Sequence, residues 1–212
     1  MISAREALQR LRQGNRRFVS AFAGDRGPTE IRPRDLVAGQ RPHAIVLGCS
    51  DSRVPAEQIF DQGLGDLFVI RVAGNIVAPS QVGSVEFAAE QFGTRLVVVL
   101  GHTGCGAVKA TLEDMESPSP GGSPNLAAIV DRIRPAIEAL VDEASTTDPD
   151  RLLAGAVRAN IRASTHHLRH GSTLLERLID TRRLRVVGAE YSLETGEVDF
   201  FDGSDRRPED AT

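Results

Sequence analysis

Three short apolar runs, each followed by a glycine or a polar turn, most constrain how this chain folds. The runs are HAIVLGC at 43–49, DLFVIRVAG at 66–74 and RLVVVLG at 95–101. A strand of a parallel sheet is apolar on both faces because helices cover both sides of the sheet. The runs lack the strict alternation of a half-exposed strand. We therefore interpret all three as buried strands of a mostly parallel sheet.

Segments with helical spacing surround these strands. Residues 3–23 place Leu8, Leu11, Phe18 and Phe22 on one face, and QVGSVEFAAEQFG has the same spacing between the second and third strands. Further helices are predicted at about 105–115, 125–144, 150–169 and 172–181, a strand at 184–191, and a turn (LETGE) into an antiparallel strand at 198–201. The order predicts an α/β fold: a parallel central sheet with flanking helices, an antiparallel edge strand and an N-terminal helical arm.

The chain is expected to form a single domain over residues 1–212. Residues 1–28 would be the helical arm and the polar residues 203–212 a frayed tail. Neither an internal repeat nor a sharp change in composition marks a second domain.

Composition excludes several classes of function. The net charge of −4 gives no basic surface for nucleic acid. No stretch approaches the roughly 18 apolar residues that a membrane helix needs. The start, MISAREALQRLRQG, has no apolar signal region, and two cysteines are too few for a disulfide framework. We expect a soluble cytoplasmic protein with neither nucleic acid nor membrane as a partner.

The two cysteines and one histidine follow the ends of predicted strands. Cys49 ends the first run, while His102 and Cys105 follow the third in GHTGC. Ligands of open parallel sheets bind beyond the carboxyl ends of the strands, so the three side chains converge if those strands are neighbours. Two thiolates and an imidazole suit Zn²⁺, and three protein ligands leave a fourth position open, as in catalytic sites. The alternative is that each cysteine is a small buried hydrophobe.

Asp51 and Arg53 alternate with Cys49 in the sequence CSDSR. In an extended segment all three side chains point to one side, because strand side chains repeat every two residues. The arginine would then keep the carboxylate ionised and oriented. An ion pair that only ties the strand end to the next helix is the alternative.

With these residues in view, CSDSR followed by HTGCG resembles the signature of the β-class carbonic anhydrases. GQRPHAIVLGCSDSRVPAEQIF, DQGLGDLFVIRVAGN, GSVEFA, VVVLGHTGCGAV and VVGAEYSLETG extend the resemblance over roughly residues 10 to 200. It implies an enzyme with one Zn²⁺ per chain that reversibly hydrates CO₂ to bicarbonate and a proton. Cys49, His102 and Cys105 would hold the metal. Asp51 and Arg53 would be the catalytic pair that orients the attacking zinc-bound hydroxide.

The resemblance also implies a substrate pocket and an assembly. Its substrate-binding positions correspond to Gln40, Phe68, Ala73, Phe87 and Gly104, with the glutamine often reaching across a dimer interface. From the residues alone, Phe68 and Phe87 are equally explained as core. A homodimer or homotetramer is implied, in which the segment 3–23 lies on the partner; packing on its own chain is the alternative.

One position departs from part of the family. The bicarbonate-inhibited branch carries a tryptophan three residues before the first cysteine, where this chain has Val46 and no tryptophan anywhere. Arg71 and Tyr191 match other members of that inhibitory site. Because the set is incomplete, we predict no strong bicarbonate inhibition of that type.

Other functions stay open at this level. The same scaffold could hydrolyse CS₂ or carbonyl sulfide, the zinc could stabilise a non-catalytic module, or Cys49 and Cys105 could form a redox disulfide. Separately, the spacing of His166 and His170 at the end of a helix could hold a metal. A solvated helix end is the simpler explanation, since positive charge suits that end of the dipole.

Overall fold

The computed structural model describes residues 2–21, 37, 39–117, 123–142 and 148–204. Within them the strands form one five-stranded sheet in the order β2-β1-β3-β4-β5. The first four strands are parallel, and β5 is antiparallel to β4. Their bounds are β1 Ala44–Gly48, β2 Leu67–Arg71, β3 Leu96–His102, β4 Arg185–Tyr191 and β5 Val198–Asp202. The predicted α/β class is confirmed.

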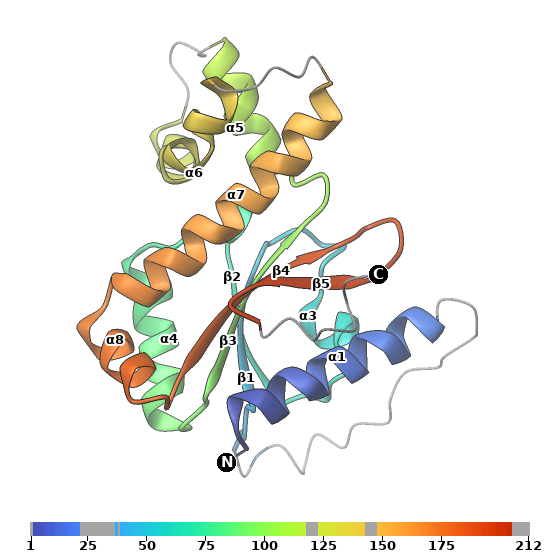
Figure 1. Ribbon diagram of the computed structural model, residues 1–212, viewed down its shortest axis with the longest axis vertical. Coiled ribbons are helices and arrows are strands. Elements are labelled where there is room, and N and C mark those ends of the chain that lie inside the picture. The colour runs from blue at the N-terminus through green and yellow to red at the C-terminus, as the bar shows by residue number, and fades with distance from the viewer. Residues whose placement is uncertain (1, 22–36, 38, 118–122, 143–147, 205–212) are drawn as a thin grey trace.

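The helices lie on both sides of this sheet (Figure 1). Their bounds are α1 Ala4–Ala21, α3 Ala56–Ile59, α4 Pro79–Gln91, α5 Gly106–Glu116, α6 Pro124–Asp142, α7 Pro149–His170 and α8 Thr173–Asp180, with a short 3₁₀ turn, η1, at Ala73–Asn75. The long helices agree with the predicted segments. The sequence did not predict α3 and η1, because one helical turn is too short to show a period. None of the described helices combines the length and apolar character that a bilayer crossing requires.

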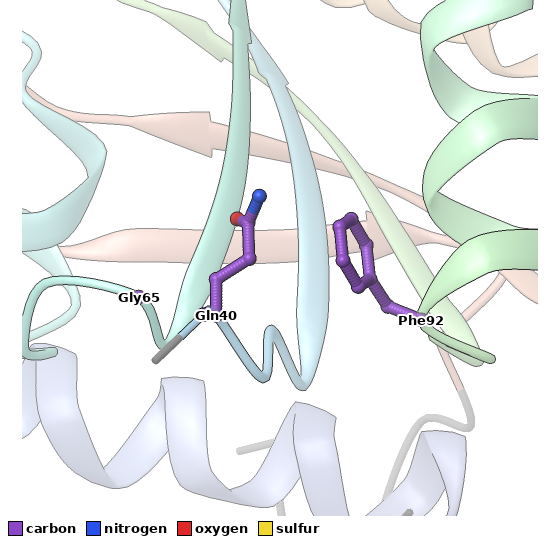
Figure 2. A pocket seen from close by; sticks show the side chains of 4 residues that line it. Gln40, Gly65 and Phe92 are labelled. Atoms are coloured by element: carbon purple, nitrogen blue, oxygen red, sulfur yellow. The ribbon is translucent and has the colours of Figure 1, made fainter. Parts of the chain in front are cut away.

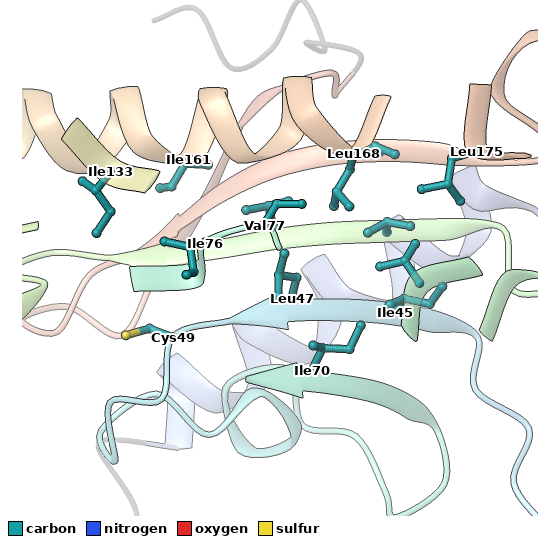
Figure 3. Packing of buried hydrophobic residues seen from close by; sticks show 14 of the residues in the cluster. Ile45, Leu47, Cys49, Ile70, Ile76, Val77, Ile133, Ile161, Leu168 and Leu175 are labelled. Carbon is teal, nitrogen blue, oxygen red and sulfur yellow. The ribbon is translucent and has the colours of Figure 1, made fainter. Parts of the chain in front are cut away.

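Alternate residues of the buried strands supply two separate cores. Ile45, Leu47, Val97 and Val99 face one side, where they pack with α4 to α8, as Figure 3 shows for part of this cluster. Their sequence neighbours on β1 and β3 face the other side and pack with α1 and α3. All residues of β1 and β3 are buried, which confirms the expectation from their uninterrupted apolar runs.

The central position of β1 and β3 decides where the site lies. The two strands are parallel neighbours, with Gly48 beside Leu100. Their carboxyl ends therefore open at the same edge of the sheet. Cys49 lies at this end of β1, at the rim of the larger core (Figure 3).

The N-terminal helix packs on its own chain. Ala7, Leu8 and Leu11 of α1 are buried in the second core. Asn15 joins three parts of the fold: its Nδ2 donates to the carbonyls of Ile59 and Gly196 at 3.2 and 2.9 Å, and its Oδ1 accepts from Val198 N at 2.9 Å. These residues of α1 therefore pack on their own chain, and contact of the helix with a partner stays a prediction. Residues 22–28 of the expected arm, and most of the tail at 203–212, lie outside the described residues.

A glycine allows the close approach of α1 to α3. A Cβ on Gly14 would overlap the backbone carbonyl of Phe60. We predict that Gly14→Ala destabilises the protein by about 1–3 kcal/mol, because the backbone on both sides must shift. Gly83→Ala is the matched control: this exposed glycine of α4 has nothing within 4 Å of its Cβ position, so alanine should stabilise by up to about 1 kcal/mol through helix propensity. Chemical denaturation at equal protein concentration measures both, and equal stability of the two variants would contradict this packing.

Candidate metal centre

Three potential metal ligands converge at the carboxyl ends of β1 and β3. The sulfurs of Cys49 and Cys105 and a ring nitrogen of His102 all lie within 4.8 Å of one another, and the three residues are buried. Tetrahedral zinc with ordinary bond lengths separates such donors by about 3.5–3.8 Å, so small side-chain movements would close the cluster on one ion. Among the described residues no other group of three such donors comes as close.

The histidine presents the correct nitrogen for a metal. Its Nδ1 lies 3.0 Å from the carbonyl oxygen of Thr103, which can only accept a hydrogen bond. Nδ1 therefore carries the proton, and Nε2 offers a lone pair. Nε2 is fully buried and has no hydrogen-bond partner. A buried nitrogen without a partner is costly, and a metal ion at the cluster removes this cost.

The electrostatics of the cluster favour a cation. A hydrogen bond from the Cys105 thiol lowers the pKa of Cys49 to about 4, although burial raises it. The same hydrogen bond, together with burial, raises the pKa of Cys105 above its ordinary value. For His102, burial lowers the pKa, but the neighbouring Cys49 raises it by more, so the net pKa lies above the ordinary value. Without metal the pair keeps one proton and one negative charge, and a divalent cation would displace that proton.

The turn η1 forms a hydrogen bond with Cys49, and helix α7 forms hydrogen bonds with η1. Gly74 N donates to Cys49 Sγ at 3.4 Å. In turn Asn160 Nδ2 donates to Gly74 O at 2.8 Å, and Ser164 Oγ donates to Asn75 O at 3.0 Å. Sequence reasoning missed Asn160 and Ser164, because nothing near them in the chain marks a contact with η1 more than 80 residues away.

Asp51 and Arg53 pair through a turn and not through an extended strand. Val54 N donates to Asp51 O at 3.0 Å, which closes a turn directly after Cys49. Within it Arg53 donates to both carboxylate oxygens, from Nε to Oδ1 at 2.9 Å and from Nη2 to Oδ2 at 2.7 Å. These bonds hold the pKa of the Asp51 carboxyl well below its usual range. The predicted pairing is present, but the extended geometry expected for it is wrong.

The Asp51 carboxylate faces the cluster. Its Oδ2 lies 3.8 Å from Nε2 of His102, and its side chain is 18% exposed. An ionised acceptor thus stands beside the buried donors and remains open to solvent. This arrangement can orient a small molecule bound at the cluster.

Arg71 ties the same loop to β2. Its Nε donates to Cys49 O at 3.0 Å, and its Nη2 donates to Asp51 O at 2.6 Å. From the sequence, Arg71 is expected only as part of an inhibitory anion site. In this structure its guanidinium fixes the backbone that carries the ligand and the carboxylate.

Two of the five predicted substrate-binding residues lie beside the cluster. Ala73 begins η1, next to the glycine that bonds Cys49, and Gly104 immediately precedes Cys105. Gly104 has φ +64°, a conformation that glycine adopts without strain and that lets the chain turn between His102 and Cys105.

Gln40, Phe68 and Phe87 are not brought to this chain's own cluster. Gln40 lies before the amino end of β1, where Arg41 N bonds Gly65 O at 3.2 Å, whereas Cys49 follows the carboxyl end. The five residues of β1 alone span about 16 Å. Gln40 instead lines an open hollow of about 470 Å³ with Gly39, Gly65 and Phe92 (Figure 2).

The two phenylalanines lie near this hollow. Phe68 pairs with Ile45 at the second position of β2. The rings of Phe68, Phe87 and Phe92 form one aromatic group, with centroids 5.8–6.2 Å apart. Phe87 is 52% exposed. It is therefore neither a core residue nor part of a closed pocket within one chain.

One alternative can be compared with the geometry. Cys49 and Cys105 are both free, so the structure contains no redox disulfide between them.

The comparisons with known proteins agree with this geometry. The model of the carbonic anhydrase family matches residues 44–198. A carbonic anhydrase of Mycolicibacterium smegmatis is 38% identical over 195 residues, which covers 92% of this chain and 91% of that protein. Carbonic anhydrase 2 of Mycobacterium tuberculosis is 35% identical over 192 residues and covers 90% and 89%.

Solved structures show the same fold. The β-carbonic anhydrase CafA of Aspergillus fumigatus is similar with a TM-score of 0.72 and 27% identity, covering 84% of this chain and 83% of that one. A tetrameric β-carbonic anhydrase of Sordaria macrospora has a TM-score of 0.71 and 25% identity, covering 79% and 84%.

The ligand set makes a direct prediction about metal content. We expect Cys105→Ser to lose most of the zinc that survives dialysis, because serine offers no thiolate and leaves two strong donors. His167→Ala, which removes an exposed imidazole, should keep one zinc per chain. Elemental analysis of the dialysed proteins measures this, and full zinc in the Cys105→Ser protein would contradict the ligand assignment.

Proposed function

This chain belongs to the carbonic anhydrase family, in its β class, and we propose that Cys49, His102 and Cys105 hold the zinc with which it interconverts CO₂ and bicarbonate. The observation that carries the proposal is the buried, unpartnered Nε2 of His102 within 4.8 Å of two cysteine sulfurs. Three protein donors, rather than four, fit a catalytic zinc with a position left for solvent.

The chemistry divides between metal and protein. When bound, zinc lowers the pKa of a coordinated water, which supplies a nucleophile near neutral pH. The protein contributes orientation through a hydrogen-bond acceptor. Asp51 Oδ2 lies 3.8 Å from Nε2 of His102, where it would accept a hydrogen bond from the attacking water and orient an oxygen lone pair toward the carbon of CO₂.

Arg53 keeps Asp51 available for this role. Because its guanidinium donates to both carboxylate oxygens, the carboxyl remains ionised and its plane is fixed. Arg71 acts on the backbone, because its guanidinium donates hydrogen bonds to the carbonyls of Cys49 and Asp51. Gly104 and Ala73, beside the ligands, leave room for a small substrate.

The remaining pocket residues are supplied, in this proposal, by a second copy of the chain. Gln40, Phe68 and Phe87 lie by the amino ends of β1 and β2 and on α4, and they cannot line their own chain's cluster. The exposed Phe87 and its aromatic neighbours offer an apolar face for association. A homodimer or homotetramer would bring them to the partner's zinc, where Gln40 donates to a substrate oxygen.

We also propose that the protein acts in the cytoplasm. Both cysteines must stay reduced to ligate zinc, and a reducing compartment maintains them. The whole chain, residues 1–212, is proposed to act as one catalytic domain.

The role of Asp51 can be tested separately from metal binding. Asp51→Asn should keep one zinc per chain and slow CO₂ hydration by about 10²-fold or more, because the ionised acceptor that orients the attacking water is lost. Stopped-flow hydration with parallel zinc analysis measures both. Ser52→Ala, an exposed neighbour in the same turn, should retain full rate. Near-normal turnover of Asp51→Asn would remove the carboxylate from the mechanism.

The proposed contribution of a second copy has its own test. Phe87→Asp should reduce the mass in solution and abolish most hydration activity, because a charge on the aromatic face prevents association. Leu126→Asp on α6 is the matched control, since Leu126 is also exposed, at 65%, and lies outside the aromatic group. Light scattering after size exclusion measures the mass. A Phe87→Asp protein with unchanged mass and rate would contradict the shared pocket.

A further inference from the structure

Two histidines at the end of α7 take no part in the catalytic centre. His166 and His170 are exposed and one helical turn apart, and their ring centroids lie 4.6 Å from each other. Residues four apart on a helix are neighbours on its surface. Two neutral imidazoles at this spacing form a bidentate ligand for a transition metal.

The turn after α7 brings a third donor to this pair. The chain reverses at Gly171 and Ser172, and the Ser172 hydroxyl caps α8 by accepting from Leu175 N at 3.2 Å. Ser172 also bonds Glu86 of α4 at 2.5 Å, which holds the turn against the body of the protein. This places Glu176 in the first turn of α8, with Oε1 4.0 Å from Nδ1 of His170.

Two spacings within this group are close to those of a metal site, although its three donor atoms lie less close together than those of the buried cluster. For tetrahedral zinc with nitrogen and oxygen bonds of about 2.0–2.1 Å, two donor atoms lie about 3.4 Å apart and two ligating rings have centroids about 5 Å apart. The observed 4.0 Å and 4.6 Å each differ from these values by about half an ångström. Exposed side chains cover such a difference by small rotations.

Two arginines of α7 near the pair are bound to other parts of the protein. Arg169 bonds Asp202 at 3.1 Å and Val186 O at 2.8 Å, on the sheet side of α7. Arg162 lies over the ring of Phe201, 5.0 Å from its centroid. Neither guanidinium is bound to Glu176, whose carboxylate lies beside the imidazole of His170.

We propose that His166, His170 and Glu176 form a second, surface metal site that binds one transition-metal ion such as Ni²⁺ or Zn²⁺. Imidazole suits these ions, whereas Mg²⁺ and Ca²⁺ prefer oxygen donors alone. Water fills the remaining positions because the site is exposed. The ion exchanges freely, in contrast to the buried zinc, so each chain holds one zinc after dialysis and two when zinc is in excess.

The test uses the dialysed, zinc-loaded enzyme without a histidine tag. Calorimetric titration with NiCl₂ should show one site per chain in the wild type. His166→Ala and His170→Ala should each weaken this binding at least tenfold, because either change leaves a single imidazole. His167→Ala is the matched control: this exposed histidine lies between the pair in sequence, but its ring lies against Gly171, so its removal should leave the affinity unchanged.

Glu176→Gln tests the third donor. The amide keeps the shape but removes the charge, and nickel binding should weaken while the CO₂ hydration rate stays that of wild type. An unchanged nickel affinity would contradict the three-donor site.

Absence of nickel binding by wild type, or full binding by His166→Ala and His170→Ala, would overturn the proposal. Circular dichroism confirms that each variant is folded. Hydration activity is measured in the same samples, so failure of this site is distinct from failure of the catalytic assignment.

Discussion

The convergence of two sulfurs and one ring nitrogen at the ends of adjacent parallel strands is the constraint on which the rest of the structure depends. Cys49 and Cys105 are buried, and the hydrogen bond between them lowers the pKa of Cys49, which favours a thiolate where burial disfavours charge. Nε2 of His102 is buried without a partner. A single divalent cation would balance the charge of the thiolate and give Nε2 of His102 a partner. The cluster is thus stable as a metal site and unfavourable as plain core.

The surroundings fix the ligands more firmly than the loops alone would. Helix α7 bonds η1, and η1 donates to Cys49, so a helix distant in sequence determines where one sulfur lies. On the opposite side Arg71 holds the backbone between Cys49 and Asp51. The pair Asp51–Arg53 then presents an ionised carboxylate at the open side. Rigid support of this kind allows a small, neutral substrate to be activated without large binding groups.

Three of the residues proposed for the pocket, Gln40, Phe68 and Phe87, lie away from their own chain's metal cluster. Gln40 and Cys49 lie beyond opposite ends of β1, so no side-chain rotation joins them. The proposed second copy would resolve this separation. The surface site proposed at the α7–α8 turn does not require a second chain, because its three donors come from consecutive helices of one chain.

Local sequence by itself determined the strands, the long helices and the residue types at the strand ends, because apolar runs and helical periods reflect burial over a few residues. It also placed Cys49, His102 and Cys105 at one sheet edge, provided that β1 and β3 were neighbours. Only the tertiary structure decided that adjacency, the turn that pairs Asp51 with Arg53, and the contacts of Asn160, Ser164 and Arg71. It also set Glu176 beside His170 and Gln40 far from Cys49. These relations depend on how distant segments pack, and packing energy is a property of the whole core that no short stretch of sequence encodes.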